Sequence, residues 1–310
     1  MRIGIDVSIL SESERTGVEN YCLELVGALG RLKTEHEFHL FSHRTLNRKI
    51  GLPETLKLHE GRASGKLAVW RELHLPSRLE RERINVFHSP VTALPMRSNV
   101  KKVATVHELT WLSAPGYQSG LSALPHRARL AYAAYGASAI IAVSSDTRNS
   151  IAKVYPDLAG RTVVIPHGVS EDFRRIPERE LARQLARYGL RETAYLLCVG
   201  RLDKKKNLPA LAEAFQQARY DLPVGTQLVF VGKKGDLSQR DLWRLEKIDG
   251  VQITYYVPQA DLIALMNGAL MLVHPAAHEG FGLPALEAMA CGAPVIAARR
   301  GGIVEVTGDA

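Results

Sequence analysis

The sequence predicts an α/β protein with two domains, each built on a parallel sheet. Short apolar runs, each about as long as one buried strand, recur along the whole chain. Several of these runs are followed by a loop and then by a segment with apolar residues at helical spacing, and this alternation favours parallel strands. The length of 310 residues corresponds to two domains of roughly 150 residues each.

Composition narrows the class of protein. Hydrophobic residues make up 46% of the chain, yet no apolar run reaches the roughly 18 residues that a membrane span needs. The amino end, residues 1–7, is charged too early for a signal peptide and is predicted to be the first strand. Three widely separated cysteines, Cys22, Cys198 and Cys291, have no metal-binding spacing and favour a reducing cytoplasm.

The formal net charge of +8 indicates a basic surface. Nucleic acid, anionic lipid or a phosphorylated substrate could each be attracted to such a surface. No nucleic-acid-binding module is recognisable, so no nucleic-acid partner is expected and the other two partners rank higher.

The first elements have the geometry of a phosphate-binding turn. Residues 3–7 are predicted to form a strand, residues 11–18 a loop, and residues 19–32 a helix with apolar side chains at helical spacing. The free N–H groups at such a helix start attract anions. Gly17 in the loop is therefore a candidate binding residue, and a plain helix-start glycine is the alternative.

The second predicted strand, residues 38–41, lies among three histidines, His36, His39 and His43. These histidines would lie on a short strand and at its ends, without the spacing of a zinc-binding helix. No metal site is expected there.

Residues 61–83 are rich in arginine, lysine and leucine, and include Trp70. This composition fits a basic amphipathic surface that contacts anionic lipid. It also fits a solvated helix whose arginine stems pack on the domain, and the second interpretation is favoured.

Two further strands, residues 86–89 and 102–106, end near His88 and His107. Ligands collect at the carboxyl ends of strands in open α/β sheets, so this edge is a candidate site. A structural histidine with satisfied hydrogen bonds is the alternative for His107.

The domain boundary is predicted near residue 170. A strand over residues 139–143 leads into a Ser/Asp helix cap, and another apolar segment covers residues 163–169. The polar residues 170–175 then form a linker. The predicted domains are residues 1–170 and 171–310.

The second domain repeats the alternation of strand, loop and helix. Strands are predicted over residues 195–200, 228–231, 253–257, 269–273 and 294–297, with helical segments at 178–188 and 261–266. The first of these strands ends at Gly200 and is followed at once by Arg201 and a lysine cluster. The second ends in a glycine loop that starts at Gly232.

The most informative stretch follows the strand at residues 269–273. A loop with Glu279 and two glycines precedes a helix that opens at Leu283, where Pro284 suits the first turn and Gly292 a C-terminal cap. An anion fits this helix start. Glu279 and Glu287 flank it, and sugar hydroxyls would satisfy both carboxylates. The alternative is a plain strand–loop–helix unit without a ligand.

Residues 279–295, Glu-Gly-Phe-Gly-Leu-Pro-Ala-Leu-Glu-Ala-Met-Ala-Cys-Gly-Ala-Pro-Val, closely resemble the donor-site signature of the retaining glycosyltransferases of family 4. Gly200-Arg201 with Lys206-Asn207 resembles the family's Gly-Arg…Lys-Asn motif. The segment around His107 resembles its His-Asp segment, with Glu108 in place of the usual Asp. The resemblance implies the GT-B fold, two Rossmann-like domains that face a central cleft.

The resemblance also implies roles for these residues. Arg201 and Lys206 bind the diphosphate and replace a metal ion, and the chain has no Asp-x-Asp metal-binding motif. Glu279 approaches the sugar hydroxyls, Glu287 holds the ribose, and His107 faces the transferred sugar on the acceptor side. The remaining donor-binding candidates are Gly17, Gly200, Gly232, Gly280, Phe281, Gly282 and Leu283.

The expected activity is transfer of a hexose, with mannose favoured over glucose, from a GDP- or UDP-sugar to a glycan, lipid-linked or small-molecule hydroxyl. Retention, no cofactor and no required metal are implied. The first domain would bind the acceptor, in a cytoplasmic enzyme that contacts the inner face of the membrane peripherally.

Two other functions stay open, a nucleotide-sugar epimerase and a catalytically silent nucleotide-sugar-binding module. The four intact motif residues, Arg201, Lys206, Glu279 and Glu287, disfavour the silent module. The resemblance further implies a longer carboxyl-terminal region than this chain contains.

Overall fold

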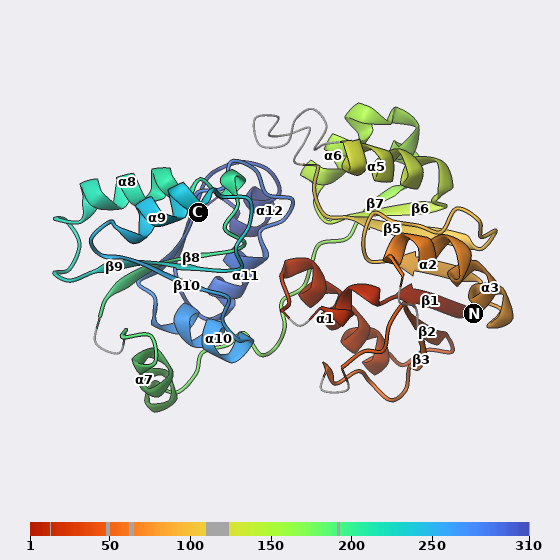
Figure 1. Cartoon of the computed structure of the whole chain (residues 1–310), viewed down its shortest axis with the longest axis horizontal. Helices are drawn as coiled ribbons and strands as arrows, with labels where there is room; N and C mark the ends of the chain where they lie inside the picture. Colours follow the sequence, from red (N-terminus) through yellow and green to blue (C-terminus); the bar gives the residue numbers. More distant parts are fainter. Residues whose placement is uncertain (13, 48–49, 62–64, 110–123, 191–192, 310) are drawn as a thin grey trace. The chain divides into compact units, whose positions relative to one another are not determined.

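The structure, a computed structural model, describes the chain except residues 13, 48–49, 62–64, 110–123, 191–192 and 310 (Figure 1). The side chains of residues 125, 126 and 129 are also outside the description. The described chain divides into two compact units, and it passes from the first to the second between Pro166 and His167. The sequence places this boundary near residue 170.

A seven-stranded parallel sheet forms the first unit, in the order β3-β2-β1-β4-β5-β6-β7. The strands are β1 (Arg2–Asp6), β2 (Glu37–Ser42), β3 (Lys57–Glu60), β4 (Val86–Ser89), β5 (Lys101–Val106), β6 (Ala139–Ala142) and β7 (Thr162–Val164). The helices are α1 (Gly17–Arg31), α2 (Leu67–Leu73), α3 (Leu75–Arg81), α5 (Leu124–Gly136) and α6 (Ser145–Val154), with the 3₁₀ turns η1 (Ser8–Ser11) and η4 (Pro156–Arg161).

Helices cover both faces of this sheet. Adjacent residues of a strand point to opposite faces, as Leu40 and Phe41 of β2 do. Leu40 packs in one hydrophobic cluster with Cys22 of α1, whereas Phe41 packs in another with Trp70 of α2. Both faces of β2 are therefore buried, as expected for a strand inside a parallel sheet.

A five-stranded parallel sheet forms the second unit, in the order β10-β9-β8-β11-β12. The strands are β8 (Tyr195–Val199), β9 (Gln227–Val231), β10 (Val251–Tyr255), β11 (Met271–His274) and β12 (Val295–Ala297). The helices are α7 (Glu178–Ala186), α8 (Leu208–Ala218), α9 (Gln239–Glu246), α10 (Gln259–Gly268), α11 (Leu283–Ala290) and α12 (Ile303–Thr307), with the 3₁₀ turn η5 (Lys204–Lys206).

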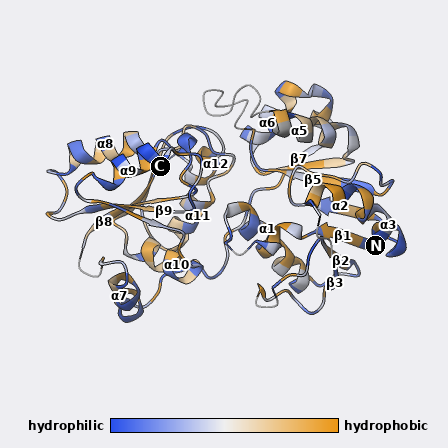
Figure 2. Ribbon diagram, in the orientation of Figure 1, coloured by the Kyte–Doolittle hydropathy of each residue, from blue (hydrophilic) through white to orange (hydrophobic). Residues whose placement is uncertain are grey.

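The two faces of the second sheet carry separate hydrophobic clusters. Leu196 and Cys198 of β8 pack with α8 and α9, and Tyr195 and Leu197 pack with α10 and α11. Figure 1 shows α8 and α9 on one side of this sheet and α10 on the other. Hydrophobic colour in Figure 2 gathers on the strands of both sheets, which agrees with their burial.

The predicted strands are present, with ends that shift by a few residues. The helix predicted from residue 19 begins at Gly17, because Glu19 accepts a hydrogen bond from the Thr16 N–H at 2.8 Å and so caps the first turn. The strand predicted over residues 253–257 covers Val251–Tyr255 instead. The sequence did not predict strand β3 or helices α5, α8 and α9. Over the described residues, no helix combines the length and apolar character that crossing a bilayer requires.

Candidate functional site

Strands β8 and β11 are neighbours in the second sheet, and both are parallel. Their carboxyl ends therefore meet at one edge. Gly200 and Arg201 follow β8, and His274 is the last residue of β11. The residues predicted for the donor site gather at this edge, except Gly17, which belongs to the first unit.

An ion pair between Lys206 and Glu279 lies at the centre of this edge. Lys206 Nζ donates to Glu279 Oε1 at 2.6 Å, and the Lys206 side chain is only 9% exposed. Lys205 Nζ lies 3.9 Å from the same oxygen, as does Nε2 of His274. The sequence predicted both members of the pair, but it gave no sign of their contact or of the third partner, His274.

Electrostatics fixes the charge of Glu279. Burial by itself would raise the pKa of the carboxyl group, but Lys206, His274 and Lys205 outweigh burial and hold it well below its usual range. Burial lowers the pKa of His274, so its ring is neutral. Glu279 is therefore a carboxylate that accepts hydrogen bonds and has no proton to donate near pH 7.

Two glycines shape the loops beside the pair. At Gly232, which has φ 152°, an added Cβ would stand 1.9 Å from the carbonyl oxygen of Gly200. At Gly200, with φ 141°, a Cβ would stand 3.1 Å from Cε of Lys206. Only glycine suits both conformations and both close approaches. These glycines therefore let the loops after β8 and β9 meet with the Lys206 stem laid across Gly200.

Helix α11 begins beside Glu279 as predicted. Its N-cap is Gly282, whose φ of 102° turns the loop into the helix, and Pro284 lies in the first turn. At the other end Gly292 has φ 83°, and the Ala293 N–H reaches the Ala288 carbonyl at 2.9 Å. This is the glycine-capped end that the sequence predicted.

Four further predicted donor-site residues belong to the same strand–loop–helix unit. Gly280 and Phe281 are buried in the loop, and the Phe281 ring packs edge-on against His167 at 5.0 Å between centroids. Leu283 opens α11, where the first N–H groups lack helical acceptors. Glu287, in the second turn, is only 9% exposed.

Two aspartates that the sequence reasoning missed join the loops after β8 and β9. Asp203 accepts from the Asp236 N–H at 3.0 Å, and Asp236 accepts from the Lys204 N–H at 2.7 Å. Arg201 donates from Nε to Asp203 at 3.1 Å, and its side chain is 55% exposed. Each aspartate lies a few residues past a strand end, Asp203 after β8 and Asp236 after β9, and this shared position could have indicated a contact between the two loops.

The first unit places His107 at the carboxyl end of β5. Its Nε2 lies 2.8 Å from the Pro90 carbonyl oxygen, and its ring packs edge-on against Tyr21 with centroids 5.0 Å apart. A carbonyl only accepts, so Nε2 carries a proton. Burial lowers the pKa of His107, and the neutral ring therefore has Nδ1 as an acceptor.

A second buried histidine supports this edge. His88 Nε2 lies 2.9 Å from Oγ1 of Thr105, and the Tyr21 hydroxyl lies 3.3 Å from the same atom. Burial, and then the neighbouring His107, lower the pKa of His88 to about 4. Tyr21 belongs to α1, whose first residue is Gly17. The structure therefore brings α1 and His107 to the same edge of the first sheet.

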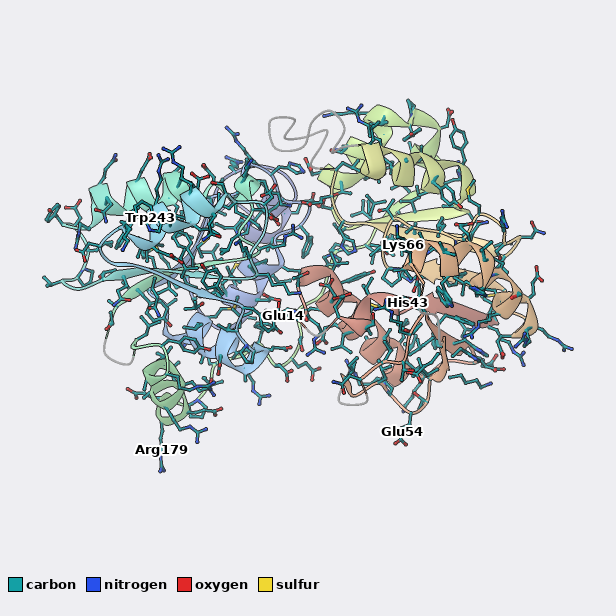
Figure 3. All side chains as sticks on the ribbon, in the orientation of Figure 1. Glu14, His43, Glu54, Lys66, Arg179 and Trp243 are labelled. Atoms are coloured by element: carbon teal, nitrogen blue, oxygen red, sulfur yellow. The ribbon has the colours of Figure 1, made fainter. Side chains whose placement is uncertain are left out.

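In the basic segment at residues 61–83, of which residues 62–64 lie outside the description, Trp70 and Arg71 are buried in their own domain. Trp70 is 2% exposed and lies near His43, which Figure 3 labels together with Lys66, the N-cap of α2. Arg71 forms a buried ion pair with Asp6, in which Nη2 of Arg71 lies 3.0 Å from Oδ2 of Asp6. These side chains serve the core of the first unit, in agreement with the interpretation that the sequence favoured.

The predicted site residues thus form two groups. The second unit holds the ion pair together with Gly200, Arg201, Gly232 and the start of α11, and the first unit holds Gly17 and His107. The predicted residues of the second unit include charged side chains, whereas those of the first unit are neutral hydrogen-bonding groups.

Two family models match the chain. The model described as "Glycosyltransferase Family 4" matches residues 15–173, and the model described as "Glycosyl transferases group 1" matches residues 183–310. Together they cover both units of the structure.

Curated relatives include two mannosyltransferases that align along nearly the whole chain. O-antigen chain mannosyltransferase B of Escherichia coli is 29% identical over 95% of this chain and 82% of its own length. The GDP-mannose-dependent alpha-(1-6)-phosphatidylinositol monomannoside mannosyltransferase of Mycolicibacterium smegmatis is 28% identical over 95% of this chain and 80% of its own.

Solved structures of glycosyltransferases share the fold. Anabaena Alr3699/HepE in complex with UDP-glucose has a TM-score of 0.72 at 17% identity, over 99% of this chain and 82% of that one. WaaG, a glycosyltransferase involved in lipopolysaccharide biosynthesis, has a TM-score of 0.73 at 18% identity, over 98% and 83%. The expected GT-B fold is confirmed.

Proposed function

Because the chain belongs to glycosyltransferase family 4, with a group 1 glycosyl transferase domain in its second half, we propose that it transfers a hexose from a nucleoside-diphosphate sugar to an acceptor hydroxyl with retention of anomeric configuration. The observation that carries this proposal is the buried Lys206–Glu279 pair at the edge where β8 and β11 end.

The lysine suits the leaving group. As the bond between the anomeric carbon and the β-phosphate oxygen breaks, negative charge grows on the diphosphate. Lys206, fixed by its ion pair, and the exposed guanidinium of Arg201 supply positive charge without a metal ion. Metal-independent catalysis is therefore part of the proposal.

The glutamate suits the sugar. Glu279 stays ionised, so it accepts hydrogen bonds from sugar hydroxyls and stabilises positive charge at the anomeric carbon. It is not a proton source. In the proposed front-face reaction the acceptor oxygen bonds to the anomeric carbon on the side from which the diphosphate departs. The acceptor proton moves to the departing phosphate oxygen.

The start of α11 suits the rest of the donor. The amides of the loop at residues 280–282 and of Leu283, the first residue of the helix, would bind sugar and phosphate oxygens. Glu287, one turn into the helix, would accept from the ribose hydroxyls. Gly200 and Gly232 would act indirectly, because they let the two loops meet with Lys206 lying against Gly200.

Mannose from GDP-mannose is the proposed first choice of donor. Similarity along nearly the whole chain to two mannosyltransferases supports it, and one of them is named as GDP-mannose-dependent. UDP-glucose is the second choice, since HepE shares the fold and was solved with that ligand.

The acceptor is proposed to bind the first unit. His107, neutral and fixed through Pro90, offers Nδ1 as an acceptor for a hydroxyl proton. A glycan or lipid-linked sugar is the proposed acceptor class, and peripheral contact with an anionic membrane remains a prediction.

A donor screen followed by a turnover assay tests the proposal. We expect calorimetry to show binding of GDP-mannose or UDP-glucose that weakens in Lys206→Ala but not in Lys204→Ala. Nucleoside diphosphate should then appear only when an acceptor is added. Release or epimerisation of the donor without acceptor would overturn the transfer reaction, and donor binding without any turnover would favour a silent binding module.

A further inference from the structure

Two histidines on neighbouring strands of the first sheet meet nitrogen to nitrogen. His39 of β2 and His59 of β3 have Nδ1 and Nε2 2.9 Å apart, with ring planes only 5° from parallel. The strand register puts His59 opposite Phe41, and the His59 ring stacks on Phe41 at 4.8 Å. Both imidazoles are therefore held in place before any ligand arrives.

A carboxylate completes the cluster from a third element. Glu82, the residue after α3, brings Oε2 to 3.9 Å from Nδ1 of His39 and Oε1 to 3.8 Å from Nδ1 of His59. One ligand atom from each of the three side chains lies within 4.8 Å of the others. Ligands about 2.0–2.1 Å from a tetrahedral ion stand roughly 3.3 Å apart, so the three side chains would draw together to close the shell.

Burial and charge also suit a cation. The side chain of His39 is 2% exposed, while His59 and Glu82 are 23% and 31% exposed, which leaves one side open to water. Lys57, which lies opposite His39 in the strand register, is held by Glu37 at 2.7 Å, and within the described residues the Glu82 carboxylate has no lysine or arginine partner.

A ring nitrogen of His39 lacks a hydrogen-bond partner within the described chain. Nε2 of His39 is buried and makes no hydrogen bond, with Oε2 of Glu37 3.7 Å away. If Nδ1 binds a metal ion, Nε2 must carry the ring proton, and Glu37 becomes its acceptor. Carboxylate–histidine–metal arrangements of this kind orient metal ligands in many proteins.

We propose that His39, His59 and Glu82 form a zinc site in the first unit, with water as the fourth ligand. Two imidazoles and one carboxylate suit Zn²⁺, whereas Mg²⁺ and Ca²⁺ prefer oxygen ligands alone. The ion would tie β3, which is the edge strand of the sheet, to β2 and to the end of α3. Its role is structural, and it supplies no step of sugar transfer.

The proposal revises the expectation drawn from His36, His39 and His43. The spacing of these three histidines indicated no metal site, because the partners of His39 lie twenty and more residues further along the chain. Only the pairing of β2 with β3 and the position of α3 bring them together.

Zinc titration of the chelator-treated full chain tests the site. We expect calorimetry to show one tight Zn²⁺ per chain and thermal unfolding to shift upward on its addition. His59→Ala and Glu82→Gln should weaken binding at least tenfold and abolish the thermal shift. Glu37→Gln should cost about 10- to 100-fold in affinity if Glu37 orients His39.

His36→Ala is the matched control, since His36 is an exposed histidine three positions before His39. It should leave zinc affinity unchanged. Co²⁺ in place of Zn²⁺ should give the visible absorption of a four-coordinate site in the parent and in His36→Ala, but not in His59→Ala. Circular dichroism and donor binding confirm that each variant is folded. Absence of stoichiometric binding by the parent, or equal affinity in His59→Ala and Glu82→Gln, would overturn the proposal.

Discussion

The carboxyl edges of the two sheets differ in how they handle charge. In the second unit the edge holds a buried lysine–carboxylate pair, with another lysine and a histidine within 3.9 Å of the same carboxylate oxygen. In the first unit the part of the edge around His107 is neutral, because His88, His107, Tyr21 and Thr105 meet there through hydrogen bonds and ring packing. The buried ion pair of Asp6 with Arg71 lies at the end of β1, two strands away from β5 in the sheet. The surroundings of Glu279 and of His107 therefore differ in charge.

This difference fits the proposed division of the transfer reaction between the two units. A diphosphate needs fixed positive charge where its own charge grows. An acceptor hydroxyl needs a neutral hydrogen-bonding surface that does not compete for that charge. In the second unit, Gly200 and Gly232 also let the loops after β8 and β9 pack closely together. Experiments that change one edge should leave the other edge's property intact.

The largest effect is expected from Lys206→Ala. Losing a fixed charge on the leaving group should lower kcat by about 10²- to 10³-fold. Glu279 would also be left buried without its main partner, which costs about 3–5 kcal/mol of folding free energy. Activity assays and urea unfolding measure the two effects. Lys204→Ala, an exposed lysine of the same turn, is the control.

A double variant separates the two effects of Lys206. Lys206→Met with Glu279→Gln removes both charges, so folding stability should recover relative to Lys206→Ala while activity stays low. A Lys206→Ala protein that turns over at the parent rate would show that the charged edge is structural only.

The neutral edge should be sensitive to acid. Because the pKa of His88 is lowered to about 4 in the folded chain, its neutral form contributes stability above pH 6.5. This contribution is lost as pH falls from 6.5 towards 4, by up to about 3 kcal/mol at 1.36 kcal/mol per pH unit. Urea midpoints at several pH values measure the slope, and His88→Gln should flatten it. An unchanged slope in the variant would contradict the assignment.

At the charged edge, substitutions of Glu279 and of Glu287 should change different properties, kcat and donor affinity respectively. Ribose hydroxyls do not change during reaction, so Glu287→Ala should weaken donor binding by about 1.5–3 kcal/mol, roughly ten- to a hundredfold. Positive charge at the anomeric carbon appears only in the transition state, so Glu279→Gln should chiefly lower kcat. Steady-state kinetics with donor calorimetry separates them. Normal turnover with collapsed donor affinity in Glu279→Gln would remove that residue from the reaction centre.

The sequence predicted most of the fold, because apolar runs and glycine loops are local signals. It missed β3, whose residues Lys57–Glu60 are mostly exposed and form no apolar run. Edge strands bury little, so hydrophobic periodicity is weak there.

The sequence also predicted which residues belong to the candidate donor site, but it did not predict the contacts that set their chemistry. The contact of Lys206 with Glu279 spans 73 positions, and that of Asp6 with Arg71 spans 65. Nothing in the sequence pointed to His274 as a buried neighbour of Glu279. Such pairs arise from strand order, which single-sequence reasoning does not fix.

The smallest effect on turnover is expected from removing metal ions. This experiment separates the chemistry of the second unit from the stability of the first. If Lys206 and Arg201 carry the diphosphate charge, EDTA should leave donor affinity and kcat unchanged, because no ion takes part at the charged edge. If His39, His59 and Glu82 bind zinc, the same treatment should lower the unfolding temperature. Calorimetry with donor and thermal unfolding, both before and after EDTA, measure the two outcomes on one sample.

Activity should be assayed well below the unfolding temperature, so that a loss of fold is not mistaken for a loss of chemistry. A strict need for Mg²⁺ or Mn²⁺ in donor binding would refute the role given to the two cationic side chains, whatever the zinc result. A metal-dependent unfolding temperature with metal-independent turnover would assign the ion to the fold and the chemistry to the lysine and arginine.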